Sequence, residues 1–294
     1  MTLDRRKFLA GSVALFAAGC SSLKRGIVVG SKNFTEQLIL GELLAQVLEK
    51  SCAVRVQRRF YLAGTYICQQ AILAGRIDAY PEYTGTALAA VLKQNASGSA
   101  GQVYEEVKQE YREKFGLAIM PPLGFNNSFA MVMRGDDARR LGVSKLSQLA
   151  GEAPELRLGV GYEFLERQDG YQGLVRAYDL KFAEAPRVMD LGLLYRALQN
   201  HSVDIVAGSN TDGLIAALGL VVLEDDRHYF PPYDAVPIVR PELLAGFPGA
   251  RQAFEGMAGR ISAEEMRAMN YAVDGQHRDA AVVVHQFLQQ HSLV

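Results

Sequence analysis

The chain has 294 residues, of which 49% are hydrophobic and 21% charged, and its formal net charge at pH 7 is −1. This composition is typical of a folded protein with one large domain or two medium ones, and it excludes an intrinsically disordered chain. A near-neutral charge, with no basic run beyond the N-terminus, also argues against a nucleic-acid partner.

The first 20 residues have the features of an export signal. A twin-arginine pattern, DRRKFL, begins at Asp4, and the apolar run that follows over residues 9–18 is too short to span a bilayer. The run ends at Cys20 in a sequence that resembles a bacterial lipobox, although Ala17 stands where leucine is usual. We therefore expect residues 1–20 to be a twin-arginine signal peptide and Cys20 to carry lipid; cleavage to a soluble secreted form is the alternative.

Hydrophobic periodicity predicts a β-α-β-α-β opening, which is typical of a parallel sheet with helices on its faces. We expect Pro81 to end the third strand, because proline lacks a backbone donor. Tyr83 and Thr86 would then lie in the turn beyond it, where open α/β sheets bind small ligands; simple packing of the tyrosine is the alternative. The predicted elements are strands at 26–30, 54–61 and 77–80 and helices at 37–49 and 65–74.

The second half of the chain repeats this pattern after a passage rich in Pro, Gly and Asn at residues 121–128. Two changeovers, near Asn127 and near Pro231, predict two crossings between lobes that are built alike, and so a hinge with a cleft. The predicted elements are strands at 130–134, 156–162, 203–207 and 221–225 and helices at 103–115, 173–178, 191–199, 251–258, 263–271 and 280–290.

No catalytic, metal-binding or nucleotide-binding motif occurs in the sequence, so we expect no cofactor and no metal. Asp169 and Glu166 lie near Arg167, a pattern most simply explained as the charged face of a helix. Cys52 and Cys68 could form a disulfide in an exported chain, but two free thiols are the expected state.

Tyrosine recurs at predicted turns, and aromatic faces that converge in a cleft can hold a quaternary ammonium ion. The candidates are Tyr61, Tyr66, Tyr83, Tyr195 and Tyr233. Packing in the core is the alternative for any one of these rings. Lys32, in the turn after the first strand, is either a ligand contact or a solvated surface lysine.

Several motifs agree, in order, with one family. The segments are GSKNFTEQ from Gly30, YPEYTGT from Tyr80, GFNN from Gly124, TDG from Thr211, and the stretch from Glu224 to Tyr233. Together they resemble the glycine betaine/carnitine/choline-binding proteins of ABC importers. The resemblance implies an α/β type II periplasmic binding protein, with two α/β lobes joined by two crossover strands around a ligand cleft. Lobe 1 would comprise residues 26–126 and 232–294, and lobe 2 residues 127–231.

The same resemblance implies a cage of four tyrosines around the ammonium group of the ligand. Tyr83 and Tyr233 match two of these positions, Phe129 stands at the third, and Ser209 at the fourth. Because Ser209 supplies no ring, we expect Tyr66 to contribute one from another wall of the pocket.

Contacts to the carboxylate of the ligand map by resemblance onto Lys32, Thr86 and Arg167, with Asn127 at a polar position of the pocket. A guanidinium can bind a carboxylate through two parallel hydrogen bonds. The resemblance thus predicts that one molecule is held at its cationic end by rings and at its anionic end by Lys32 and Arg167.

The predicted function is capture of a quaternary-amine zwitterion and its delivery to an ABC permease with a cytoplasmic ATPase. We expect a monomeric periplasmic lipoprotein, held at the membrane by its lipid, that is not an enzyme. A receptor of the same fold for a different small amino acid, or for a betaine-like amino-acid derivative, is the first alternative. A periplasmic enzyme or sensor domain is the second.

Overall fold

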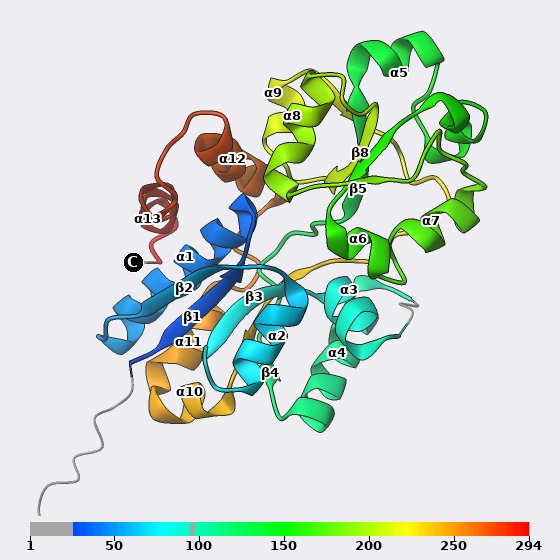
Figure 1. Ribbon diagram of the computed structural model, residues 1–294. Coiled ribbons are helices and arrows are strands. Elements are labelled where there is room, and N and C mark those ends of the chain that lie inside the picture. Colours follow the sequence, from blue (N-terminus) through cyan, green and yellow to red (C-terminus); the bar gives the residue numbers. More distant parts are fainter. Residues whose placement is uncertain (1–25, 95–97, 294) are drawn as a thin grey trace, which may run out of the picture.

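The computed structural model describes residues 26–94 and 98–293 and has two lobes, each built on its own five-stranded sheet (Figure 1). The predicted signal peptide and Cys20 lie outside the described residues. Cys52 and Cys68 are free thiols, as expected. Within the described part of the chain, no helix is long and apolar enough to cross a membrane.

The first lobe has the sheet order β2-β1-β3-β10-β4, in which β1, β2 and β3 are parallel, as the sequence predicts. The fourth strand, β10, runs antiparallel to β3 and was not predicted. The strands are β1 (Val28–Lys32), β2 (Gln57–Leu62), β3 (Ala79–Tyr83), β4 (Ala118–Ile119) and β10 (Ala235–Val239). The helices are α1 (Thr35–Cys52), α2 (Thr65–Leu73), α3 (Thr84–Thr86), α4 (Ala100–Phe115), α10 (Pro241–Gly246), α11 (Pro248–Gly256), α12 (Ala263–Asp274) and α13 (Ala280–Gln290).

Pro81 does not end the third strand, so that prediction is wrong. Strand β3 runs through it to Tyr83, and Pro81 lies opposite Pro237 of β10. Backbone hydrogen bonds at the flanking pairs Asp78–Arg240 and Thr84–Asp234 place the two prolines at a non-hydrogen-bonded position of the antiparallel ladder. Neither proline is therefore required to donate to the other strand. Tyr83 is the last residue of β3, and α3 follows at once, continuing as a π-helical turn over Ala87–Leu92.

The second lobe has the sheet order β7-β6-β8-β5-β9, in which β5 runs antiparallel to both of its neighbours. Its strands are β5 (Phe129–Arg134), β6 (Leu158–Val160), β7 (Arg187–Val188), β8 (Ile205–Ser209) and β9 (Leu220–Val222). Its helices are α5 (Gly135–Leu141), α6 (Tyr162–Glu166), α7 (Tyr171–Tyr178), α8 (Leu194–Gln199) and α9 (Leu214–Ala217), with short 3₁₀ turns at Leu146–Ala150, Ala153–Glu155 and Leu191–Leu193.

The chain passes between the lobes twice, and the two passages lie side by side. Asn126 pairs with Asp234 in an isolated antiparallel bridge, and the backbone N–H of Asn127 donates to the carbonyl of Tyr233 at 3.0 Å. Two adjacent extended segments of this kind allow two lobes to rotate about them. The exact lobe boundaries at 126/127 and 231/232 stay predictions.

Helix α1 fixes one wall of the site because an apolar stripe on its inward face is buried in the core of the first lobe. Leu40, Leu43, Leu44 and Leu48 recur at helical spacing and are fully buried, and the helix packs against β1, α11, α12 and α13 (Figure 1). The first turn of α1 therefore holds a fixed position at the carboxyl end of β1, facing the second lobe.

Candidate ligand-binding site

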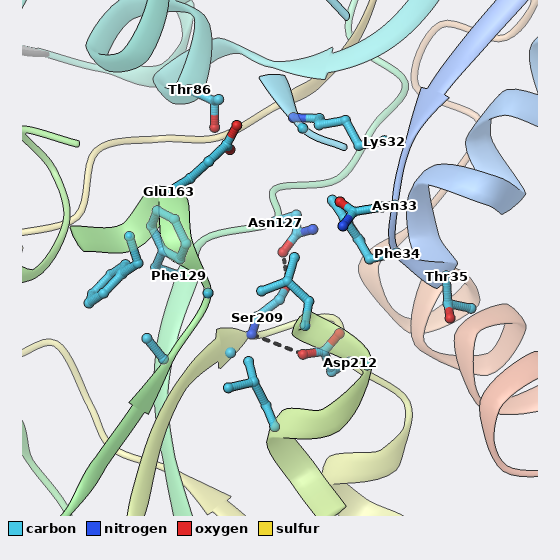
Figure 2. A pocket seen from close by; sticks show the side chains of 18 of the residues that line it. Lys32, Asn33, Phe34, Thr35, Thr86, Asn127, Phe129, Glu163, Ser209 and Asp212 are labelled. Carbon is cyan, nitrogen blue, oxygen red and sulfur yellow. Dashed lines mark hydrogen bonds between the residues drawn. The ribbon is translucent and has the colours of Figure 1, made fainter. Parts of the chain in front are cut away.

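A cavity of about 200 Å³ lies between the lobes and is lined by residues of both. It is smaller than the roughly 300–1,000 Å³ of pockets that hold drug-sized molecules, so it suits a small ligand. Figure 2 shows Lys32, Thr86 and Glu163 toward one end and Ser209 and Asp212 toward the other. All but one of the predicted site residues line this cavity: Lys32, Tyr83, Thr86, Asn127, Phe129, Arg167, Ser209 and Tyr233.

Tyr66 is the exception, because it does not line the cavity. It lies on α2, where its hydroxyl accepts a hydrogen bond from Lys93 Nζ at 3.3 Å and the same ammonium group stands 5.0 Å from the ring centroid. In this structure the ring that was expected to complete the cage is engaged by a lysine of its own lobe.

Lys32, the last residue of β1, is buried and already paired. Its ammonium group forms an ion pair with Glu82 and donates to Thr65 Oγ1 at 3.0 Å. The same group lies 4.9 Å from the centroid of the Tyr83 ring, within the range of a cation–π contact. A ligand carboxylate could therefore draw only on the remaining N–H of Lys32.

Arg167 is also buried and paired within the chain. Its Nε and Nη2 donate to the two carboxylate oxygens of Asp169 at 2.8 and 2.5 Å, and its Nη1 donates to Thr86 Oγ1 at 3.1 Å. Burial lowers the pKa of Arg167, but the facing carboxylate outweighs this effect and the net pKa is raised. Asp169 accepts a further hydrogen bond from the Tyr233 hydroxyl at 2.6 Å. The fork that was expected to bind a ligand carboxylate is thus occupied by Asp169.

The aromatic rings form one cluster around this guanidinium. The Phe129 centroid lies 5.0 Å from that of Phe164 and 5.6 Å from that of Tyr233, in edge-to-face geometry. The guanidinium carbon of Arg167 lies 4.7 Å from the Phe129 centroid and 5.9 Å from the Tyr233 centroid. With Lys32 over Tyr83, each of the three expected cage rings already contacts a cation of the protein.

Glu36, in the first turn of α1, joins the lobes beneath the cavity. Its Oε1 accepts hydrogen bonds from the Tyr83 hydroxyl at 2.7 Å and from Asn127 Nδ2 at 2.6 Å. Its Oε2 accepts from Thr211 Oγ1 at 2.6 Å and from Asn270 Nδ2 at 3.0 Å. Burial raises the pKa of Glu36, and the four donors only partly offset this rise. Thr211 belongs to the second lobe, so this carboxyl connects the two lobes.

Asp212 dominates the other end of the cavity. Its Oδ2 accepts hydrogen bonds from the Tyr195 hydroxyl and, at 3.0 Å, from the backbone N–H of Ser209. Burial, reinforced by the nearby carboxyls of Glu36 and Asp274, raises the pKa of Asp212 to about 7. Asp274 accepts from Thr35 Oγ1 at 2.5 Å, and its pKa is also raised, chiefly by burial.

The lobes touch directly at the mouth of the cavity. The Tyr162 hydroxyl donates to the carbonyl of Ala63 at 3.0 Å, and Glu163 Oε1 accepts from the backbone N–H of Thr65 at 2.8 Å. Gly64, between these two contacts, has no room for a Cβ, which would lie 2.5 Å from the Tyr162 hydroxyl. The N-terminal turn of α6 therefore closes against the start of α2.

Sequence reasoning missed Glu36, Asp169 and Asp212 as site residues. Glu36 and Asp212 lie inside the GSKNFTEQ and TDG motifs, so those motifs were the available signal. The sequence predicts a surface charge at Asp169, because the alternation of acids with Arg167 is typical of a solvated helix. In the structure Asp169 follows α6 and is buried behind Arg167.

Comparison with known proteins places this geometry among transport proteins. Residues 25–290 match the family model described as the substrate-binding domain of ABC-type glycine betaine transport systems. The chain is 32% identical over 287 residues to a carnitine transport binding protein, OpuCC, of Listeria monocytogenes, covering 95% of this chain and 93% of that one.

Two further matches carry other ligand names. An ergothioneine transport permease/binding protein, EgtU, of Helicobacter pylori is 32% identical over 268 residues, covering 91% of this chain and 48% of that one. A solved structure described as a glycine betaine/carnitine/choline ABC transporter superimposes with a TM-score of 0.74 at 30% identity, covering 91% of this chain and 99% of the other.

Proposed function

We propose a ligand and a role for this chain, which belongs to the family of substrate-binding domains of ABC-type glycine betaine transport systems. It captures a quaternary-amine zwitterion between its two lobes and delivers it to an ABC permease. The observation that carries this proposal is the cavity itself, in which the rings of Tyr83, Phe129 and Tyr233 and the cations Lys32 and Arg167 border one space. The family is one of extracytoplasmic solute-binding proteins, which is not an enzyme class.

Each end of a zwitterion has a partner in this cavity. The rings border the space, so a trimethylammonium group can pack on them for about 0.5–2 kcal/mol per ring. The nearby cations repel it weakly, because Glu82 and Asp169 neutralise them. The ligand carboxylate takes the N–H groups of Lys32 and Arg167 that the protein leaves unused. Asn127, whose amide donates to Glu36, lines the cavity between its two ends.

Sequence identity does not choose among quaternary amines. Relatives at 32% identity are named for carnitine and for ergothioneine, and the solved structure at 30% is described with three ligands. A receptor for a betaine-like amino-acid derivative is therefore the second candidate, favoured by Ser209, which leaves the cavity open where the family resemblance expects a ring.

The test is thermal unfolding of the full chain with glycine betaine, choline, carnitine, ergothioneine and ordinary amino acids. A ligand present at 100 times its dissociation constant stabilises the folded state by about 2.7 kcal/mol, which raises the melting temperature measurably. We expect a response to at least one quaternary amine. A response to a plain amino acid alone would contradict the proposal.

The location and partners follow from the family and from the first 20 residues. We propose export by the twin-arginine route, lipidation at Cys20, and a monomer that meets a permease coupled to a cytoplasmic ATPase. Cys20→Ser is expected to move the protein from the membrane fraction to the soluble periplasmic fraction; retention in the membrane would contradict lipid anchoring.

A further inference from the structure

The two ends of the cavity differ in how their charged groups are paired. At the Arg167 end, the two cations are paired with Glu82 and Asp169. At the other end, Asp212 Oδ2 accepts from Tyr195 and Ser209, but no hydrogen bond from the described residues reaches Asp212 Oδ1. An acceptor that borders the cavity is therefore left for a donor on the ligand.

No cation of the protein serves this acceptor. Among the residues that line the cavity only Lys32 and Arg167 are basic, and both are engaged at the opposite end. None of the ion pairs found among residues 26–94 and 98–293 includes Asp212 or Asp274. A carboxylate without a basic partner favours a positively charged or hydrogen-donating ligand group over a second carboxylate.

The arrangement around Asp212 is closely packed. The Tyr195 ring crosses strand β8 at Gly208, where a Cβ would lie 3.2 Å from the ring carbon Cζ and 3.3 Å from Asp212 Oδ2. Leu191, Leu194 and Leu214 also line the cavity and pack in the same apolar cluster as Tyr195. Tyr195 and Asp212 thus form a wall of the cavity beyond Ser209, in which the polar carboxyl group is flanked by apolar side chains.

We propose that Asp212 and Tyr195 are the specificity-determining residues of this cavity, and that they select a quaternary amine carrying an N–H or O–H donor at a distance from its ammonium group. This inference rests on the proposed function. Glycine betaine has no such donor, so it leaves Asp212 Oδ1 without a partner. A longer ligand passes Ser209, keeps its ammonium group against the rings and donates to Asp212. Tyr195 donates its hydrogen bond to Oδ2 of Asp212, and the ligand donates to Oδ1.

The experiment is calorimetric titration of the full chain with four probes. Glycine betaine lacks a donor, choline and carnitine carry a hydroxyl, and ergothioneine carries a ring N–H. We expect at least one donor-bearing probe to bind tenfold or more tightly than glycine betaine. Asp212→Asn should weaken that probe by roughly 10- to 100-fold, the range for a hydrogen bond to a charged group, and should narrow its advantage over glycine betaine.

Two further variants allow the proposal to be tested if Asp212→Asn perturbs folding. Ser209→Tyr fills the passage with a ring, so it should weaken the donor-bearing probe and strengthen glycine betaine. Asp136→Asn makes the same chemical change on an exposed aspartate of α5, in the same lobe, and should leave all affinities within twofold.

The outcomes separate the two proposals. If glycine betaine is the tightest ligand, or if Asp212→Asn weakens every probe by the same factor, the specificity inference is wrong while the proposed function stands. If no quaternary amine binds the wild-type chain, the proposed function fails, and the inference fails with it.

Discussion

Carboxyl groups and aromatic rings occur at both ends of the cavity, but only one end has cations to pair with them. At the Arg167 end, each cation has a carboxylate partner and each ring contacts a cation. At the Asp212 end, the carboxyl groups have hydrogen-bond donors but no cation, and burial raises the pKa of Asp212 to about 7. The cations of the first end have counter-charges within the protein, whereas the carboxyl groups of the second end have none.

This difference separates the groups that hold the cavity together from the groups that choose its occupant. The buried ion pair of Arg167 and Asp169 fixes the position of the Thr86 and Tyr233 side chains that it contacts. Its cost of desolvation has already been met by folding. An acceptor with an unused oxygen, by contrast, gains from a ligand that supplies the missing donor. We therefore expect substitutions at the Arg167 end to act mainly on stability and those at the Asp212 end mainly on ligand choice.

The largest expected effect is on stability at the Arg167 end. Asp169→Asn leaves the buried guanidinium of Arg167 without a counter-charge, and removing one partner of a buried pair typically costs about 3–5 kcal/mol. The free energy of unfolding, measured by urea denaturation of the ligand-free chain, should fall by that amount.

Two controls test whether the uncompensated charge is the cause. The double variant Arg167→Met/Asp169→Leu removes both charges and should recover most of the lost stability. Asp136→Asn breaks an exposed pair with Arg139 and should cost less than about 1 kcal/mol. An Asp169→Asn loss no larger than that of the surface control would contradict the difference between the two ends.

The next effect is a pH dependence confined to the Asp212 end. Choline is a permanent cation, so its own charge is constant between pH 6 and pH 8. Over that interval the ionised fraction of a group with a pKa of about 7 falls from about nine-tenths to about one-tenth as the pH is lowered. Choline affinity should therefore fall roughly tenfold from pH 8 to pH 6, measured by titration calorimetry.

The stability of the ligand-free chain should change in the opposite direction. A carboxyl whose pKa is raised on folding binds its proton more tightly in the folded state. The stability that this proton confers is fully present below about pH 4 and is lost as the pH rises through about 7. Asp212→Asn should remove the pH dependence of choline affinity and reduce that of stability, to which Glu36 and Asp274, whose pKa values are also raised by burial, still contribute. A variant with the wild-type pH profile of choline affinity would show that another group titrates.

The fold was largely predictable because periodicity reports which face of an element is buried. The parallel β1-β2-β3 unit and helix α13 were found in this way. Strand β10 was not, because its role depends on pairing with a strand far away in the sequence. The same pairing explains why Pro81 is tolerated: whether proline ends a strand depends on which side of the ladder its missing donor faces, and only the partner strand decides that.

The sequence predicts which residues meet at the site. It does not predict which of them are already paired with other residues of the protein. Motif resemblance placed Lys32 and Arg167 at the cavity, where the structure has them. Their carboxylate partners, Glu82 and Asp169, are only two of the 32 acidic residues in the sequence. Burial and geometry select them, and neither is visible in a linear pattern. The same is true of the tyrosines. Tyr66 and Tyr195 are both predicted as candidate rings from the sequence, but they have different surroundings in the structure.

The smallest expected effect is at Tyr66, and its comparison is with Tyr233. Tyr66 lies outside the cavity against Lys93, so Tyr66→Ala should change ligand affinity by less than about twofold. Tyr233→Ala, which removes a ring that borders the cavity, should weaken binding by roughly 2- to 30-fold, as expected for the loss of about 0.5–2 kcal/mol of cation–π contact. Both affinities can be measured by titration with whichever quaternary amine binds most tightly. An equal loss in the two variants would mean that Tyr66 moves into the site when ligand binds, and that the ring missing at Ser209 is supplied by the first lobe.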